Sequence, residues 1–244
     1  MIISHIHKYV FVELPLTGTT AISNELRRNY AGRPILKKHS TYTTFLRQAS
    51  QEERDYFAFS CIRHPMDTIV SHYFKLKTDH FDFEDPEKLK KRSLLNRFVY
   101  QRLYLDQLKF IRASDADFAS YFLKFYKRPY SNWAVLSHHE MDFLIRFENL
   151  QSDFETALRR IGIEPVRELP MHNKTRARAK SFADYYTGAC VPRAKSVFKC
   201  FMEEWGFEFP PGFGDVEIST VDRFHYQFLN IMRKAYWTNL KQGR

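Results

Sequence analysis

The 244-residue chain is poor in cysteine, glycine and proline. Its three cysteines, Cys61, Cys190 and Cys200, are odd in number and lack zinc-ligand spacing, so the sequence indicates neither a disulfide framework nor a metal site. Eight glycines and ten prolines argue against a low-complexity chain. No stretch approaches the roughly 18 apolar residues of a membrane span, and Glu13 interrupts the short apolar run near the N-terminus. For a complete chain, these absences predict a soluble, cytoplasmic protein without a transmembrane segment.

Acidic residues are also few: 28 Asp and Glu stand against 38 Lys and Arg, which gives a net charge of +10. A basic surface attracts phosphate, sulfate, nucleic acid or acidic glycans, although ordinary solubility explains the charge as well. Apolar residues make up 44% of the chain and aromatic residues 16%, enough for a substantial core. We expect one domain over residues 1–244.

Short apolar runs alternate with helical patterns along the chain. Strands are expected over 8–14, 34–40, 56–62 and 141–147. Helices are expected from Thr19 or Thr20 through Arg28, from Pro65 onward, and over about 152–161, 190–204 and 219–240. Residues 75–130 are charged and aromatic and are interpreted as a helical insertion. This alternation predicts an α/β fold with a parallel sheet and helices on both faces.

The segment 15–20, Pro-Leu-Thr-Gly-Thr-Thr, follows the first predicted strand, at the sheet edge where ligands bind in such folds. Gly18 can adopt a positive φ, and the backbone amides of residues 17–20 suit an anion at the start of a helix. Three threonine hydroxyls add donors. The segment is not the nucleotide motif G-x-x-x-x-G-K-[ST]. A tight turn without a ligand remains an equal alternative.

A second turn follows the strand that ends at Ile62. Arg63 offers a planar guanidinium suited to phosphate, and Ser71 adds a hydroxyl on the helix that starts near Pro65. The alternatives are a surface salt bridge for Arg63 and a solvated helix position for Ser71.

Taken together, these turns resemble those of sulfotransferases that use 3′-phosphoadenosine 5′-phosphosulfate (PAPS), closest to the carbohydrate-type branch, sulfotransferase family 2. Residues 15–21 resemble the family's P-K-T-G-[GT]-T-[ST], and residues 63–71 resemble its R-[ND]-P-x-D-R-x-x-S. "ILKKHSTYTTF", "FLIRFENLQSDFETALRRIGI" with its R-[FY]-E-x-L core, "LPMHNKTRARAKSFADYYT" and "VFKCFMEEWGFEF" match further segments in order. The resemblance covers roughly residues 8–210. It implies a sulfotransferase fold related to the P-loop nucleotide kinases.

The resemblance also implies roles for individual residues. Transfer of the PAPS sulfuryl group to a hydroxyl acceptor, a carbohydrate or another small molecule, requires a donor site and a base but no metal. His39 is the implied catalytic base, because an imidazole titrates near neutral pH, although a lone histidine is more often structural. The implied donor-binding residues are Leu16, Thr17, Gly18, Thr19 and Thr20 at the 5′-phosphosulfate, Arg63 and Ser71 at the 3′-phosphate, and Lys174 and Arg176 in a late basic loop. For that loop, a solvated run of basic residues without a ligand is an equal alternative.

Leu16 departs from the family pattern, which has lysine at this position. Loss of one donor to a developing oxyanion typically costs on the order of 10²–10³ in rate. Lys37 or Lys38 could replace the missing charge, the enzyme could be slow, or the chain could be a PAPS- or PAP-binding protein without turnover. A nucleic-acid-binding protein and a P-loop kinase are weaker alternatives, since no nucleic-acid motif and no loop lysine are present.

The acceptor site is expected in the 75–130 insertion and in the following segment "SNWAVLSHHE", and the aromatic residues there are for the most part expected in the core. The last predicted helix carries an apolar stripe that includes Phe224, Phe228 and Ile231. That stripe would either pack on the domain or seat a second subunit in a homodimer, and the sequence leaves both open.

Overall fold

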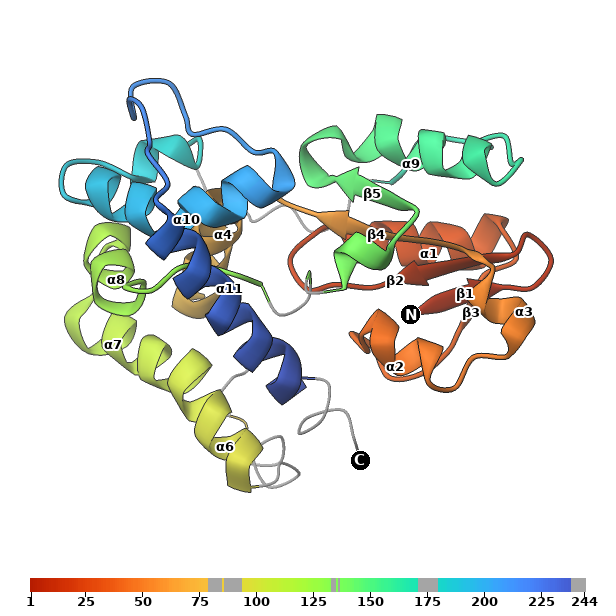
Figure 1. Cartoon of the computed structure of the whole chain (residues 1–244), viewed down its shortest axis with the longest axis horizontal. Coiled ribbons are helices and arrows are strands. Elements are labelled where there is room, and N and C mark those ends of the chain that lie inside the picture. Colours follow the sequence, from red (N-terminus) through yellow and green to blue (C-terminus); the bar gives the residue numbers. More distant parts are fainter. Residues whose placement is uncertain (79–84, 86–93, 133–134, 136, 171–179, 238–244) are drawn as a thin grey trace. The chain divides into compact units, whose positions relative to one another are not determined.

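The computed structural model describes residues 1–78, 85, 94–132, 135, 137–170 and 180–237 (Figure 1). Its backbone forms two compact units. The first comprises Met1–His64, Ser131–Lys174 and Asn230–Arg244, and the second comprises Pro65–Tyr130 and Thr175–Leu229. The assignment of the whole chain to one domain stays a prediction. Within the described residues, no helix has both the length and the apolar composition needed to cross a bilayer.

The first unit is built on a five-stranded sheet with the order β3-β1-β2-β4-β5. Its strands are β1 (Ile2–Ser4), β2 (Tyr9–Val12), β3 (Arg33–Pro34), β4 (Phe57–Ile62) and β5 (Phe143–Arg146). The predicted strands at 8–14, 56–62 and 141–147 are confirmed as β2, β4 and β5. The strand predicted over 34–40 is wrong beyond Pro34, because Leu36 and His39 have φ values of 56° and 64°, which an extended strand excludes.

The sheet is mixed rather than parallel throughout. Strands β2, β4 and β5 run parallel to one another, as predicted, whereas β1 is antiparallel to both β2 and β3. Only residues 5–8 join β1 to β2, and a parallel connection needs a crossover of a dozen or more residues. The parallel part is therefore the half of the sheet from which the candidate turns emerge.

One face of the sheet packs against two helices, α1 (Thr19–Asn29) and α9 (Leu150–Arg160). Phe11 and Phe59 from neighbouring strands are fully buried against Ile22 of α1 and Phe154 of α9. The short helices of this unit are α2 (Tyr42–Leu46), α3 (Gln51–Arg54), η3 (His138–Glu140) and η4 (Phe147–Asn149). The core thus holds α1 against β2, and this fixes the turn between them.

The second unit is helical within its described residues, which confirms the helical interpretation of residues 75–130 for its described part, 75–78 and 94–125. Its elements are α4 (Pro65–Lys77), α6 (Leu94–Tyr100), the π-helix η1 (Gln101–Leu105), α7 (Asp106–Ser114), α8 (Phe118–Phe125), η5 (Ala183–Tyr185) and α10 (Cys190–Trp205). Helix α11 (Thr220–Ala235) begins in this unit. Aromatic side chains dominate its core: Tyr121, Phe122 and Phe198 are fully buried, as expected for aromatic residues at helical spacing.

Candidate anion-binding site

The turn between β2 and α1 is capped by glycine. Gly18 occupies the N-cap position with φ 76° and ψ 1°, and no side chain caps the helix that starts at Thr19. The prediction that Thr19 or Thr20 caps this helix is therefore wrong, because Gly18 takes that place in a left-handed conformation. The first N–H groups of α1 have no partner within the helix, and the helix dipole adds positive potential there. This end of α1 suits an anion such as phosphate or sulfate.

Two of the three threonines of the turn use their hydroxyls internally. Thr17 and Thr19 both donate to the carbonyl oxygen of Leu14, with oxygen–oxygen distances of 3.2 and 2.6 Å. A hydroxyl has one proton, so neither can also donate to an anion in this conformation. The pair instead locks the turn to the end of β2. Thr20, which is half-buried, remains as the hydroxyl available to a ligand.

Arg63, at the end of β4, reaches the same turn. Its Nη1 donates to the carbonyl oxygen of Leu16 over 2.9 Å, and its guanidinium carbon lies 4.0 Å from the ring centroid of Phe147. Leu16 itself has a φ of 68°, in the left-handed region that non-glycine residues seldom adopt. The structure thus places a guanidinium beside the residue that stands where the family has lysine.

Phe147, which directly follows β5, supports both turns. A Cβ atom on Gly18 would lie 3.2 Å from the Phe147 ring and 3.3 Å from Leu150. Glu148 accepts a hydrogen bond of 2.7 Å from the backbone N–H of His64, next to Arg63. These residues lie in a segment that resembles the family, but no role was predicted for them. Their position after the third strand was the available signal, because parallel strands end at one edge.

His39 is also anchored at this edge. Its Nδ1 lies 3.1 Å from the carbonyl oxygen of Glu13, the residue that follows β2. A carbonyl can only accept, so Nδ1 carries the proton and Nε2 carries the basic lone pair. Burial lowers the pKa of His39 below the usual imidazole value, and the charge of Lys38 lowers it further, whereas the hydrogen bond to Glu13 opposes the shift. The imidazole is therefore neutral at pH 7, the state that a base requires.

For the other predicted residues, the structure gives less information about a role in the site. Ser71 lies on α4 in the second unit and is fully buried, so its role at a 3′-phosphate stays a prediction. Lys174 and Arg176 lie outside the described residues. Lys37 and Lys38 are exposed, and Lys38 acts electrostatically on His39. The structure therefore gathers the turn of residues 16–20, His39 and Arg63 within the first unit.

These features define an α/β protein with an anion-binding turn and a histidine held beside it. The model of the sulfotransferase family matches residues 1–199, well over half of the 244 residues. The chain therefore belongs to the sulfotransferase family, as a member of family 2, and this membership supports an enzyme of sulfuryl transfer. No significant match to a curated protein or to a solved structure was found.

Replacement of Gly18 by alanine tests the packing of the turn. Alanine must adopt the positive φ and also displace Phe147, so we expect the free energy of unfolding to fall by about 2–3 kcal/mol in urea denaturation. Gly162→Ala is the matched control, because Gly162 has a similar φ of 74° and nothing within 4 Å of a new Cβ. It should cost about 1 kcal/mol. Equal losses for the two variants would contradict the contact with Phe147.

Proposed function

We propose that the protein transfers the sulfuryl group of PAPS to a hydroxyl acceptor, in particular a carbohydrate. The observation that carries this proposal is the contact of Arg63 with the Leu16 carbonyl, which brings a fixed cation to a glycine-capped helix N-terminus. Membership of the sulfotransferase family makes a sulfonucleotide the anion that best fits such a donor set. In the proposal, PAPS supplies the activated sulfuryl group.

Two sets of groups in this chain would hold the donor. The backbone N–H groups at the start of α1 suit the 5′-phosphosulfate, since no side chain caps that helix. The guanidinium of Arg63 suits a phosphate through paired hydrogen bonds. By resemblance, Ser71 joins Arg63 at the 3′-phosphate, and Lys174 and Arg176 complete the nucleotide site. Recognition of the 3′-phosphate would distinguish this donor from ATP.

His39 would remove the proton from the acceptor hydroxyl. The hydrogen bond to the Glu13 carbonyl fixes its tautomer, which directs the basic Nε2 away from that contact. A base with a lowered pKa is ready to accept a proton at neutral pH. The acceptor site itself is assigned to the helical insertion, whose basic and aromatic residues suit an acidic or neutral sugar.

Leu16 keeps a second function open, that of a PAPS- or PAP-binding protein without turnover. A leucine cannot neutralise the leaving phosphate oxygen as the S–O bond breaks. Arg63 contacts residue 16 directly and would replace that charge only if it does not bind the 3′-phosphate instead. Lys38 is the second candidate, because its positive charge acts on His39 and lowers the pKa of that imidazole. Turnover of labelled sulfate onto any acceptor in a glycan panel would exclude the binding-only function.

Calorimetric titration with PAP, the desulfonated donor, tests the donor site. We expect PAP to bind about 10–100-fold more tightly than AMP, because a charge-assisted contact to the 3′-phosphate contributes about 1.5–3 kcal/mol. Arg63→Ala should abolish this preference. Arg27→Ala, on the exposed last turn of α1, removes the same charge and should keep it. Equal affinity of the unaltered protein for PAP and AMP would contradict the assignment.

The base is tested by His39→Asn together with a pH profile. Asparagine tolerates the φ of 64° and can donate to the Glu13 carbonyl, but it cannot take the acceptor proton. We expect kcat to fall by about 10²–10⁴ with PAP affinity unchanged. In the unaltered protein, activity should be lost as the pH falls through the lowered pKa of His39, below about 6.5. His5→Ala, at an exposed histidine, should change neither property.

Restoring the family lysine tests the departure at Leu16. Leu16→Lys keeps the same backbone cost, because lysine is no more strained than leucine at a φ of 68°. We expect kcat to rise by up to about 10²-fold if the leaving group is under-stabilised. Leu16→Met, which adds no charge, should leave kcat unaltered. Equal rates for the lysine and methionine variants would mean that Arg63 or Lys38 already supplies the charge.

A further inference from the structure

Helix α11 exposes a continuous apolar stripe. Val221, Phe224, Phe228, Ile231 and Met232 are each between 53% and 76% exposed. At these fractions the stripe presents on the order of 600 Å² of apolar surface, as large as the biggest patch on a typical monomer. The helix lies beyond residue 199, where the family match ends. The stripe therefore lies outside the part of the chain that the family model matches.

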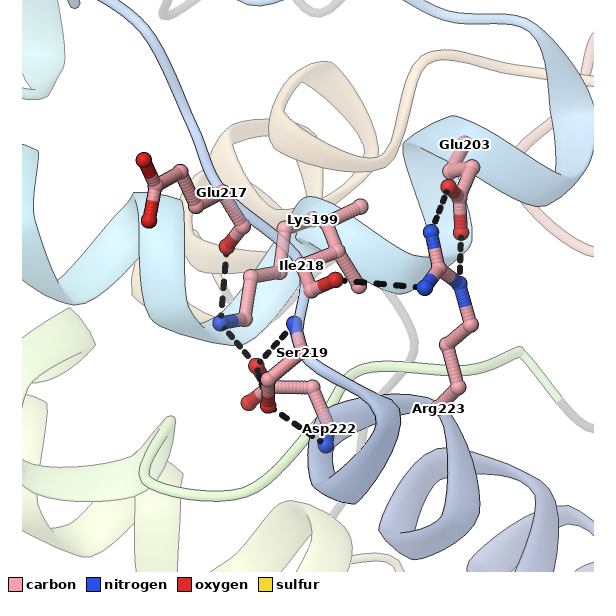
Figure 2. Close-up of polar contacts among 7 residues, drawn as sticks. All are labelled: Lys199, Glu203, Glu217, Ile218, Ser219, Asp222 and Arg223. Atoms are coloured by element: carbon pink, nitrogen blue, oxygen red, sulfur yellow. Dashed lines mark hydrogen bonds and ion pairs between the residues drawn. The ribbon is translucent and has the colours of Figure 1, made fainter.

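At the start of α11, the charged side chains Asp222 and Arg223 bind α10 (Figure 2). Arg223 forms a two-fold ion pair with Glu203 of α10, at 2.6 and 3.1 Å. Asp222 accepts from Lys199 of α10 at 2.5 Å, and this contact helps to lower the pKa of Asp222 to about 2. Tyr226 donates to Glu204. A helix in a globular protein normally buries its apolar stripe, so this inverted attachment leaves the stripe facing outward and held in place.

The spacing of the stripe matches a helical partner better than a membrane. Val221, Phe224, Phe228, Ile231 and Ala235 follow one another at intervals of three, four, three and four, which is the narrow seam of a coiled coil. Helices that lie in a membrane surface carry lysine and arginine on a free polar face. Here Arg223 is used in the ion pair with Glu203.

We propose that the stripe of α11 is a homodimer interface, in which α11 of a second copy packs antiparallel across a two-fold axis near Phe228. Two such stripes would remove roughly 1,200 Å² from water, within the range of specific interfaces. An antiparallel pair centred on Phe228 lets both copies bury the same stripe residues, as a two-fold interface requires. It also opposes the two helix dipoles, whereas a parallel pair would align like ends. This inference is independent of the proposed function.

Sedimentation equilibrium of the full chain tests the interface. The unaltered protein should be a dimer at micromolar concentration, and the double variant Phe224→Glu, Phe228→Glu should be a monomer with an unchanged circular dichroism spectrum. Phe98→Glu is the control, because Phe98 is 61% exposed on α6 and lies outside the stripe. A monomeric unaltered protein, including one that instead binds anionic lipid vesicles, would overturn the proposal. So would a dimer that survives the double substitution.

Single cysteine substitutions test whether the two α11 helices pack antiparallel or parallel. The native cysteines are free and buried, which keeps the background low. Phe228→Cys should form an intermolecular disulfide under mild oxidation, because position 228 lies beside its own copy at the axis. Val221→Cys should not, because its two copies would lie about 20 Å apart in an antiparallel pair, far beyond disulfide range. Cross-linking at both positions would indicate a parallel pair. Cross-linking at neither position would indicate another interface. Either result would overturn the proposed arrangement.

Discussion

The ring of Phe147 is the contact on which the rest of the site depends. It lies so close to Gly18 that a Cβ atom there would have to displace the ring, and it also contacts the guanidinium of Arg63. These residues follow β5, β2 and β4, which end at one edge because the strands are parallel. A cation–π contact contributes only about 0.5–2 kcal/mol. Its larger effect is geometric, because one ring sets the distance between two turns that contact the same ligand in the proposed function.

The contact of Arg63 with residue 16 bears on the loss of the family's lysine, because it brings a positive charge to that position. In the family pattern, a loop lysine carries the charge on a flexible side chain. Here a guanidinium from the neighbouring strand is held at residue 16 by a hydrogen bond and an aromatic ring. If Arg63 held the leaving phosphate rather than the 3′-phosphate, a preorganised charge of this kind would stabilise the developing anion without reorganisation during the reaction. Leu16 therefore removes a cation from the loop itself, but the loop still has a cation beside it.

The sequence predicted the parts of this arrangement that depend on local pattern. Apolar runs located β2, β4 and β5, and the glycine located the turn before α1. It did not predict the strand β1, which has only three residues, or the left-handed backbone of Leu16, Leu36 and His39. Non-glycine residues adopt that conformation only when tertiary contacts hold them there. The role of Phe147 was missed for the same reason, because it consists of contacts with residues distant in the chain.

Helix α11 is a second case in which contacts between distant residues decide what the sequence pattern leaves open. The apolar stripe was visible in the sequence, and ordinary experience with amphipathic helices would place it against the core. Side chains outside the stripe instead determine which face of α11 packs on the protein. Arg223 and Asp222 find oppositely charged partners on α10, and a helix that satisfies these ion pairs cannot turn its apolar side toward the same neighbour. Burial of that stripe would contribute more free energy than surface ion pairs do, and in the proposed dimer a second copy would supply that burial.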